Sequence, residues 1–395
     1  MRVVIRLKLK DGIMSGISNN GYFDAGSWNS WKFCYYDSAK GAEVVDQAAL
    51  DQYLDQYAQQ MLSNGMSQTT ISFAQVDDIA KILKGDYKDC NQSDSLYMLD
   101  KNVGDLQING KPVFDYMVQR LSQDGLKVFL AFGGQSGTWN FNFGSLPNDP
   151  STMGKNLADW AKSIGLSGID FDAEYSAESM VSTNGSQNLA AFFSSLHSEA
   201  HSSGMPVSWT VMGDSTQWGF SQGYFADIFN TQKGGAPFND MFDGLNLMLY
   251  NGQYYLNAEN PPTQSWDLGT WIKEMAENTG LSPTQCASML HVGFDSALDY
   301  SKQGTSGGPL PYDSSTIPSD VKTSGQYAAY IMLQLQNELQ KIFNSPDLTL
   351  GTSFSWDDNA NYNVPINPQT HNCPCPFFSN NTFEQDFYNY LKSHT

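Results

Sequence analysis

Short apolar stretches, rich in β-branched and aromatic residues, recur along the chain between longer polar stretches. Each is bounded by Gly, Asp, Asn or Ser, which is typical of short strands buried in a sheet. The eight expected strands are residues 32–36, 70–74, 127–132, 168–171, 207–212, 244–250, 288–294 and 349–356.

Between these strands, apolar residues recur at the spacing of an amphipathic helix, which brings them onto one face. The expected helices are residues 47–64, 114–122, 152–164, 187–202, 270–278, 325–343 and 383–391. Strands that alternate with helices pair in parallel, and eight such repeats predict a closed (β/α)8 barrel, the TIM-barrel form of the α/β class. A doubly wound sheet is the alternative, but residues 36–40 (YDSAK) lack the glycine-rich loop that it would place after the first strand.

Residues 1–30 precede the first expected barrel strand. They contain an alternating segment of their own and two turn signals, Asp11-Gly12 and Asn20-Gly21. We therefore expect a short N-terminal β extension over residues 1–30, packing on the barrel or preceding it. The barrel domain itself is expected over residues 31–395.

The chain is strongly acidic, and this restricts its partners. It has 395 residues, with 21 Lys and Arg against 41 Asp and Glu, a formal net charge of −20. Such a charge repels nucleic acid and anionic lipid, and no basic patch in the sequence offsets it. No stretch approaches the roughly 18 apolar residues of a transmembrane helix, and no signal peptide is visible. We expect neither a nucleic acid nor a membrane partner.

Three carboxylates alternate with apolar residues in the segment 167–175 (SGIDFDAEY). Alternate residues of a strand share a face, so Asp170, Asp172 and Glu174 should line the barrel interior and rise toward its C-terminal mouth. Like charges that point into a core are costly unless they share protons or serve a site. The pattern therefore predicts an acidic functional site at the end of this strand.

This segment resembles the DGxDxDxE signature of glycoside hydrolase family 18, the chitinase family, with Ser167 in place of the first Asp. Other landmarks of that family recur in order: residues 70–77 resemble its second strand, residues 132–136 the SxGG segment, residues 248–251 the M-x-Y-D/N element and Trp356 the eighth-strand tryptophan. The resemblance covers roughly residues 31–395 and implies a (β/α)8 catalytic domain there.

The resemblance also implies roles for individual residues. Glu174 would be the general acid and base, Asp172 and Tyr250 would hold the substrate's acetamido group, and Asp170 would share a proton with Asp172. The residues implied to bind substrate are Trp356, Met248, Asn251, Tyr36, Phe73, Gly134, Met212 and Tyr175. The chemistry is substrate-assisted and implies neither a metal nor an organic cofactor.

The function that the resemblance implies is a secreted, endo-acting chitinase that binds chitin or another N-acetylglucosamine-containing oligosaccharide, as a monomer or within a larger assembly. One alternative is an endo-β-N-acetylglucosaminidase acting on the chitobiose core of N-glycans. Another is a non-catalytic lectin on the same fold, although such members characteristically lose the glutamate that Glu174 retains.

Two further expectations concern residues outside the signature. Trp139, Trp218 and Trp266 are interpreted as exposed side chains that stack on sugar rings at outer subsites. The five histidines of the sequence are expected to form no metal-like cluster.

Overall fold

The computed structural model describes residues 20–24, 34–37, 42–63, 65–91, 107–135, 137–143, 149–174, 179–248, 268–295, 317–351, 353–356 and 383–394. Within this part of the chain, eight strands close into a barrel in the order β1-β12-β11-β10-β9-β8-β7-β4. They are β1 (Asn20–Asp24), β4 (Gln68–Ala74), β7 (Lys127–Gly133), β8 (Gly168–Ala173), β9 (Val207–Met212), β10 (Gly244–Met248), β11 (Leu290–Asp295) and β12 (Ser353–Trp356). Neighbouring strands are parallel throughout. The predicted (β/α)8 fold is confirmed.

The first barrel strand is not the predicted one. Strand β1 lies between β12 and β4 and pairs in parallel with both. The expected first strand, residues 32–36, overlaps β2 (Cys34–Asp37), which pairs antiparallel with β3 (Ala42–Val45). Two stretches separated by only four residues form a local hairpin, because a parallel partner needs a crossover of a dozen or more residues. Residues 20–24, expected in the N-terminal extension, therefore belong to the barrel.

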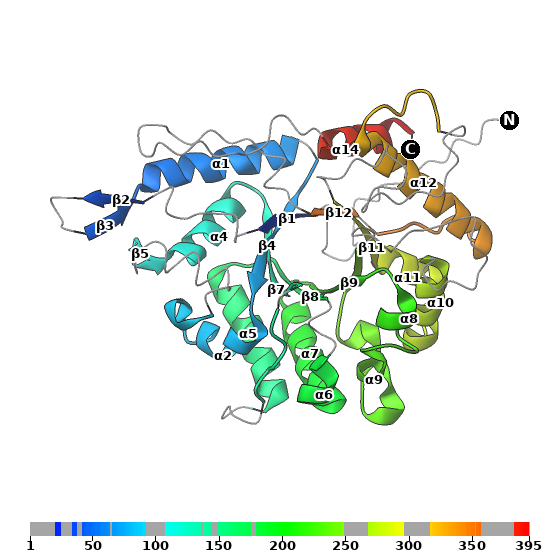
Figure 1. The fold of residues 1–395 in the computed structure, drawn as a ribbon, viewed down its shortest axis with the longest axis horizontal. Helices are drawn as coiled ribbons and strands as arrows, with labels where there is room; N and C mark the ends of the chain where they lie inside the picture. The colour runs from blue at the N-terminus through cyan, green and yellow to red at the C-terminus, as the bar shows by residue number, and fades with distance from the viewer. Residues whose placement is uncertain are drawn as a thin grey trace.

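The predicted helices are confirmed to within a few residues and surround the strands (Figure 1). The long helices are α1 (Gln47–Ser63), α4 (Val113–Gln123), α5 (Pro150–Ile164), α7 (Ser186–Ser202), α10 (Leu268–Thr279), α12 (Ser324–Ile342) and α14 (Phe383–His394). Short elements fill the connections: α2 (Ile79–Ile82), β5 (Gln107–Ile108), β6 (Lys111–Pro112), α6 (Met180–Asn184), α8 (Ser215–Trp218), α9 (Ala226–Phe229) and α11 (Pro283–Met289).

Helix α5 illustrates how local sequence sets these boundaries. Asp149 caps its N-terminus by accepting a hydrogen bond from the Thr152 N–H, and Pro150 occupies the first turn. Gly165 ends the helix with a left-handed φ of 93°. Within the helix, a Cβ on Gly154 would lie 2.3 Å from the Phe192 carbonyl oxygen. The missing side chain thus lets α5 approach α7 closely.

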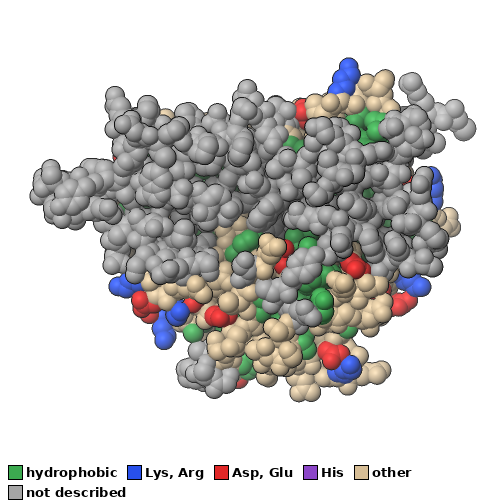
Figure 2. Space-filling model, in the orientation of Figure 1, with side chains coloured by type: hydrophobic (Ala, Val, Ile, Leu, Met, Phe, Trp, Pro, Cys, Tyr) green, Lys and Arg blue, Asp and Glu red, His purple; other side chains and the backbone are tan. Residues whose placement is uncertain are grey.

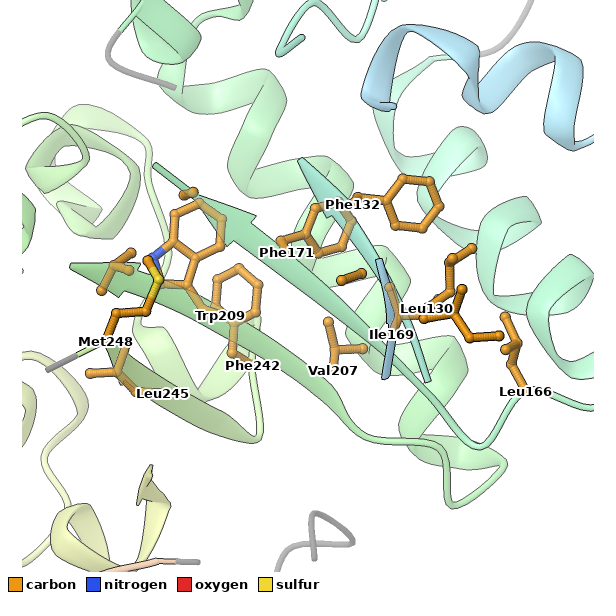
Figure 3. Close-up of a cluster of buried hydrophobic side chains, with 14 of the residues drawn as sticks. Leu130, Phe132, Leu166, Ile169, Phe171, Val207, Trp209, Phe242, Leu245 and Met248 are labelled. Carbon is orange, nitrogen blue, oxygen red and sulfur yellow. The ribbon is translucent and has the colours of Figure 1, made fainter. Parts of the chain in front are cut away.

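The apolar core lies between the strands and the helices. Phe171 of β8 packs edge-on against Phe192 and Phe193 of α7, with ring centroids 6.1 and 4.9 Å away. Figure 3 shows Phe171 close to Phe132 of the neighbouring strand, and their rings stack at 5.4 Å. Because the apolar residues of β8 face the helices, Asp170 and Asp172 on the alternate positions face the barrel interior.

On the face drawn in Figure 2, the described positive and negative side chains occur beside one another. Ion pairs elsewhere in the described part of the chain include Lys155 with Glu199 at 2.8 Å and Lys233 with Asp227 at 2.5 Å. Among the helices that the structure describes, none is long and apolar enough to span a bilayer.

Candidate active site

The three predicted carboxylates lie along the C-terminal part of β8. Asp170 and Asp172 are 1% and 2% exposed, whereas Glu174, directly after the strand, is half-buried. The series therefore runs from the barrel interior toward its C-terminal mouth, the end at which (β/α)8 enzymes place their active sites.

Asp170 is held by side chains from the next two strands around the barrel, β9 and β10. Its carboxylate accepts hydrogen bonds from Ser208 Oγ, from Thr210 Oγ1 at 2.9 and 3.0 Å, and from Asn246 Nδ2 at 3.2 Å. Asn246 Nδ2 also donates to Thr210 Oγ1 at 2.9 Å. These neutral donors stabilise a carboxylate that has no room to move. Asp170 is therefore held in one orientation at the bottom of the site.

Sequence reasoning missed Ser208, Thr210 and Asn246. The signal was available, because Ser208 and Thr210 occupy alternate positions of the apolar stretch 207–212, and Asn246 interrupts the stretch 244–250. The register pairs Asp170 with Ser208 and Thr210 with Asn246, so the polar positions of three strands meet in one layer. A polar residue at the inward positions of an otherwise apolar barrel strand was the clue.

Asp172 is buried with less support. Its Oδ1 has no hydrogen-bond partner among the described residues. Burial raises the pKa of Asp172 well above its usual value, and the nearby charges of Glu174 and Asp170 raise it further. Asp172 therefore carries a proton readily, and it presents a buried polar atom that a ligand's hydrogen-bonding group would satisfy.

Glu174 has the protonation behaviour of a general acid. Burial raises its pKa from 4.5 to about 7, although a hydrogen bond from the backbone of Gln135 partly opposes the shift. A carboxyl group with a pKa near neutral pH can both give up and recover a proton during a reaction.

Gly134 and Phe73 border this site together. The Gly134 N–H donates to the Asp172 carbonyl oxygen at 2.9 Å, so β7 and β8 stay in contact beyond the last rung of the barrel ladder. Gly134 has a φ of +80°, and a Cβ there would lie 2.7 Å from the ring of Phe73. Phe73 is half-buried, at an irregularity in the pairing of β4 with β7. The glycine is thus required by backbone conformation and by close packing.

Met212 and Met248 end β9 and β10 directly opposite each other. Each lies two residues beyond Thr210 or Asn246 on its strand, so both methionines share the interior face with those residues. Both are buried, at 2% and 3% exposure. The structure therefore brings these two predicted substrate-binding residues together, next to the carboxylate layer.

The remaining predicted substrate-binding residues are placed less fully. Tyr36 lies on β2, so it is on the hairpin and not at the end of a barrel strand as predicted. Trp356 ends β12, the eighth barrel strand along the chain, and its backbone pairs with Asp295. The side chain of Trp356 lies outside the described part of the chain, as do Tyr175, Tyr250 and Asn251.

The prediction of exposed tryptophans is wrong for Trp139 and Trp218, which are 4% and 1% exposed. Asn184 of α6 fixes the segment after β7, since its amide donates to the Trp139 carbonyl at 2.6 Å and accepts from the Phe141 N–H at 2.9 Å. Trp218 packs against Phe225 at 5.5 Å. Both rings therefore belong to the core, whereas Trp266 lies outside the described residues.

A closed parallel barrel with acidic residues toward the carboxyl end of β8, one of them with a pKa near neutral, has the arrangement expected of a barrel glycoside hydrolase. The family model described as "Glycosyl hydrolases family 18" matches residues 32–361, and the chain belongs to this family. The protein is therefore a glycoside hydrolase, as its signature segment implied.

Several solved structures are similar to this chain. A GH18 chitinase from Pseudoalteromonas aurantia is 16% identical, with a TM-score of 0.47 over 88% of this chain and 97% of that chain. A family 18 N-acetylglucosaminidase from Paenibacillus barengoltzii is 11% identical, with a TM-score of 0.41 over 85% and 94%. The xylanase and α-amylase inhibitor protein XAIP-II from Scadoxus multiflorus is 12% identical, with a TM-score of 0.43 over 94% and 98%. No curated protein matches the sequence.

Proposed function

We propose that this protein is an endo-acting chitinase that cleaves β-1,4-linked N-acetylglucosamine polymers by substrate-assisted retaining catalysis. The observation that carries the proposal is Glu174. It is half-buried at the end of β8 with a pKa of about 7, two residues beyond the buried Asp172. A single proton donor of this kind suits a reaction in which the substrate supplies its own nucleophile.

In the first step, Glu174 protonates the glycosidic oxygen. The 2-acetamido oxygen of the sugar attacks C1, the bond between C1 and the glycosidic oxygen breaks, and an oxazolinium ion forms. In the second step, Glu174 takes a proton from water while the water oxygen attacks C1 and opens the oxazolinium ring. Glu174 is protonated again at the end, and two inversions at C1 return the β configuration.

Asp172 acts on the acetamido group during these steps. Its unpaired Oδ1 suits the acetamido N–H, and its negative charge, once its proton moves toward Asp170, would stabilise the positive oxazolinium. Asp170 remains fixed by its hydrogen bonds to Ser208, Thr210 and Asn246, so the pair keeps its orientation through the reaction.

The proposal assigns the other predicted residues by position. Tyr250 would donate a hydrogen bond to the acetamido oxygen, and Trp356 would form an apolar floor under the sugar at the cleaved bond. Met212 and Met248 supply apolar surface on the interior face beside the carboxylates.

Endo action is proposed because the connection between β11 and β12 provides little sequence for a deep wall. Helix α12 takes up Ser324–Ile342 of that connection, and the Gly-, Ser- and Pro-rich residues 304–319 take up much of the rest. A shallow cleft lets a polymer bind along its length. Since chitin is an insoluble polymer that cannot enter a cell, the proposal also places the enzyme outside the cell.

The test is Glu174→Gln, which keeps the shape of the side chain but removes the transferable proton. We expect kcat on chitin oligosaccharides to fall by about 10²–10⁴-fold, with oligosaccharide binding retained. Glu277→Gln, on the exposed surface of α10, is the matched control and should keep full activity. A Glu174→Gln variant that keeps more than half of the wild-type kcat would overturn the assignment.

The same assay separates the alternatives. Mixed internal cleavage of a chitin hexamer supports endo-chitinase action, and release of dimers alone contradicts it. Cleavage of a high-mannose glycoprotein with no cleavage of the hexamer would favour the endo-β-N-acetylglucosaminidase. Binding without any turnover by the wild type would identify a lectin.

A further inference from the structure

Two histidines lie one helical turn apart near the C-terminal end of α7. His197 and His201 are separated by four residues and so share a face of the helix. Their rings face Asp243, which directly precedes β10. The three side chains meet although 42 residues separate His201 from Asp243 in the sequence.

The ligand atoms of these residues have the spacing of a metal site. His197 Nε2 and His201 Nδ1 each lie 3.2 Å from Asp243 Oδ1, and one ligand atom from each residue lies within 4.8 Å of the others. With metal–ligand bonds of about 2.0–2.1 Å, two ligands of a tetrahedral zinc ion lie about 3.3 Å apart. The carboxylate oxygen is already at that distance from both nitrogens.

The Asp243 carboxylate is fixed in place by a backbone partner. Its Oδ2 accepts a hydrogen bond from the Val207 N–H at 2.9 Å, and the Asp243 N–H donates to the Val207 carbonyl oxygen at 2.7 Å. This leaves Oδ1 directed at the histidines. Such outer hydrogen bonds commonly orient carboxylate ligands of metal sites.

The surroundings favour a metal over a simple ion pair. His197 Nε2 is buried and lies 3.2 Å from Asp243 Oδ1 without the geometry of a hydrogen bond, whereas His201 Nδ1 is hydrogen-bonded to the same oxygen. The His197 and Asp243 side chains are 14% and 13% exposed, whereas that of His201 is 70% exposed. The cluster is thus closed on one side and open on the other, where water would complete the coordination.

We propose that His197, His201 and Asp243 bind one zinc ion, with water as the fourth ligand. Two imidazole nitrogens and one carboxylate oxygen are ligands that zinc accepts readily. The cluster adjoins Val207, the first residue of β9, so it lies at the end of the barrel opposite Glu174. The N-terminal face of such barrels serves stability, and this ion would join α7 to the start of β9 and β10.

The sequence analysis expected the histidines to form no metal-like cluster, but the structure groups two of them with Asp243. Sequence spacing brings His197 and His201 together, but the third group is supplied by a distant carboxylate that only the fold places beside them. The available clue was a pair of histidines four positions apart, near the end of a helix that leads into a barrel strand.

The experiment uses the full chain after removal of metal by a chelator. Titration with zinc chloride should show one bound zinc ion per chain that is lost in His201→Ala. The His201 side chain is 70% exposed, so its removal should leave the fold intact. Because Cys373 and Cys375 can also attract zinc, the difference between variant and parent is the readout. At about 100-fold excess over its Kd, zinc should raise the Tm of the parent by a few degrees and not that of the variant.

Two variants complete the design. His201→Cys keeps a zinc ligand and should still bind this zinc ion. A thiol could not replace His201 if the histidine served only as the positive partner of Asp243. His394→Ala removes a histidine whose only carboxylate partner among the described residues is Asp320, at 3.0 Å, and should leave zinc binding unchanged. Cobalt(II) added to the parent should give the intense visible bands of four-coordinate cobalt.

Equal zinc stoichiometry in the parent and His201→Ala would overturn the proposal and leave an ion pair at this position. Hydrolysis of chitin oligosaccharides should be the same for His201→Ala and the parent, because the cluster lies away from the catalytic carboxylates. The zinc measurement therefore tests this site independently of the proposed function.

Discussion

At the residue scale, the candidate site contains two carboxyl groups whose pKa values are raised by burial. The pKa of Glu174 is raised to about 7, and that of Asp172 is raised by burial and by the two neighbouring carboxylates. Neither shift follows from the sequence, because both depend on how deeply the barrel encloses these side chains. The alternation of residues 169–174 predicted that the carboxylates share a face, but not their protonation.

Because the proposed first step needs a protonated Glu174, kcat should fall as pH rises through about 7.

The titration of Glu174 also affects the stability of the folded protein. The folded protein keeps this proton up to about pH 7, whereas the unfolded chain loses it near 4.5, so stability is lost as pH rises between these values. Glu174→Gln should therefore be more stable than the wild type at pH 8, and the gain should vanish at pH 4. Thermal unfolding of both proteins at the two pH values measures it, and an equal gain at both pH values would contradict the shift.

At the element scale, the sequence predicted where strands and helices lie better than which strands pair. Seven of the expected strands overlap barrel strands, because short apolar stretches alternate with amphipathic helices. The expected strand at residues 32–36 is not a barrel strand. A short aromatic strand has the same sequence pattern in a hairpin as in a barrel, and only its pairing partner distinguishes the two. The donors around Asp170 were missed for a related reason: their convergence depends on the register of β8, β9 and β10.

The packing of α7 on the barrel provides a test at this scale. Phe193 contacts Phe171, Trp209 and Phe242, with ring centroids 4.9, 5.5 and 5.1 Å away. Phe193→Ala should lower the free energy of unfolding by about 3–5 kcal/mol, because it leaves a cavity between β8, β9 and the helix. Leu62→Ala, at a position that is 40% exposed, should change it by less than about 0.5 kcal/mol. Urea unfolding measures both, and a similar small effect for the two would contradict the described core.

At the scale of the whole molecule, the barrel closes through β1. This strand joins the last barrel strand, β12, to β4, so residues 20–24 are part of the barrel and not of an extension that precedes it. A sequence-based boundary at residue 31 would separate β1 from the barrel that it completes, although the family match itself begins at residue 32.

A truncation tests this closure. Removal of residues 1–24 deletes β1 and exposes the unpaired edges of β4 and β12, so we expect an insoluble chain or one without a cooperative unfolding transition. Removal of residues 1–18 leaves β1 intact and is the matched control. If the shorter chain unfolded cooperatively with the Tm of the control, β1 would not be needed for the barrel.

In the proposed reaction, the substrate's acetamido group, with Glu174 as the acid and base, carries out a retaining hydrolysis. Early-time proton NMR of a chitin oligosaccharide digest measures this most directly, because it identifies the anomer that is released before mutarotation. Two inversions at C1 predict that the new reducing end appears first as the β anomer. Initial release of the α anomer would show a single inversion by a water molecule and would contradict the mechanism proposed for this site.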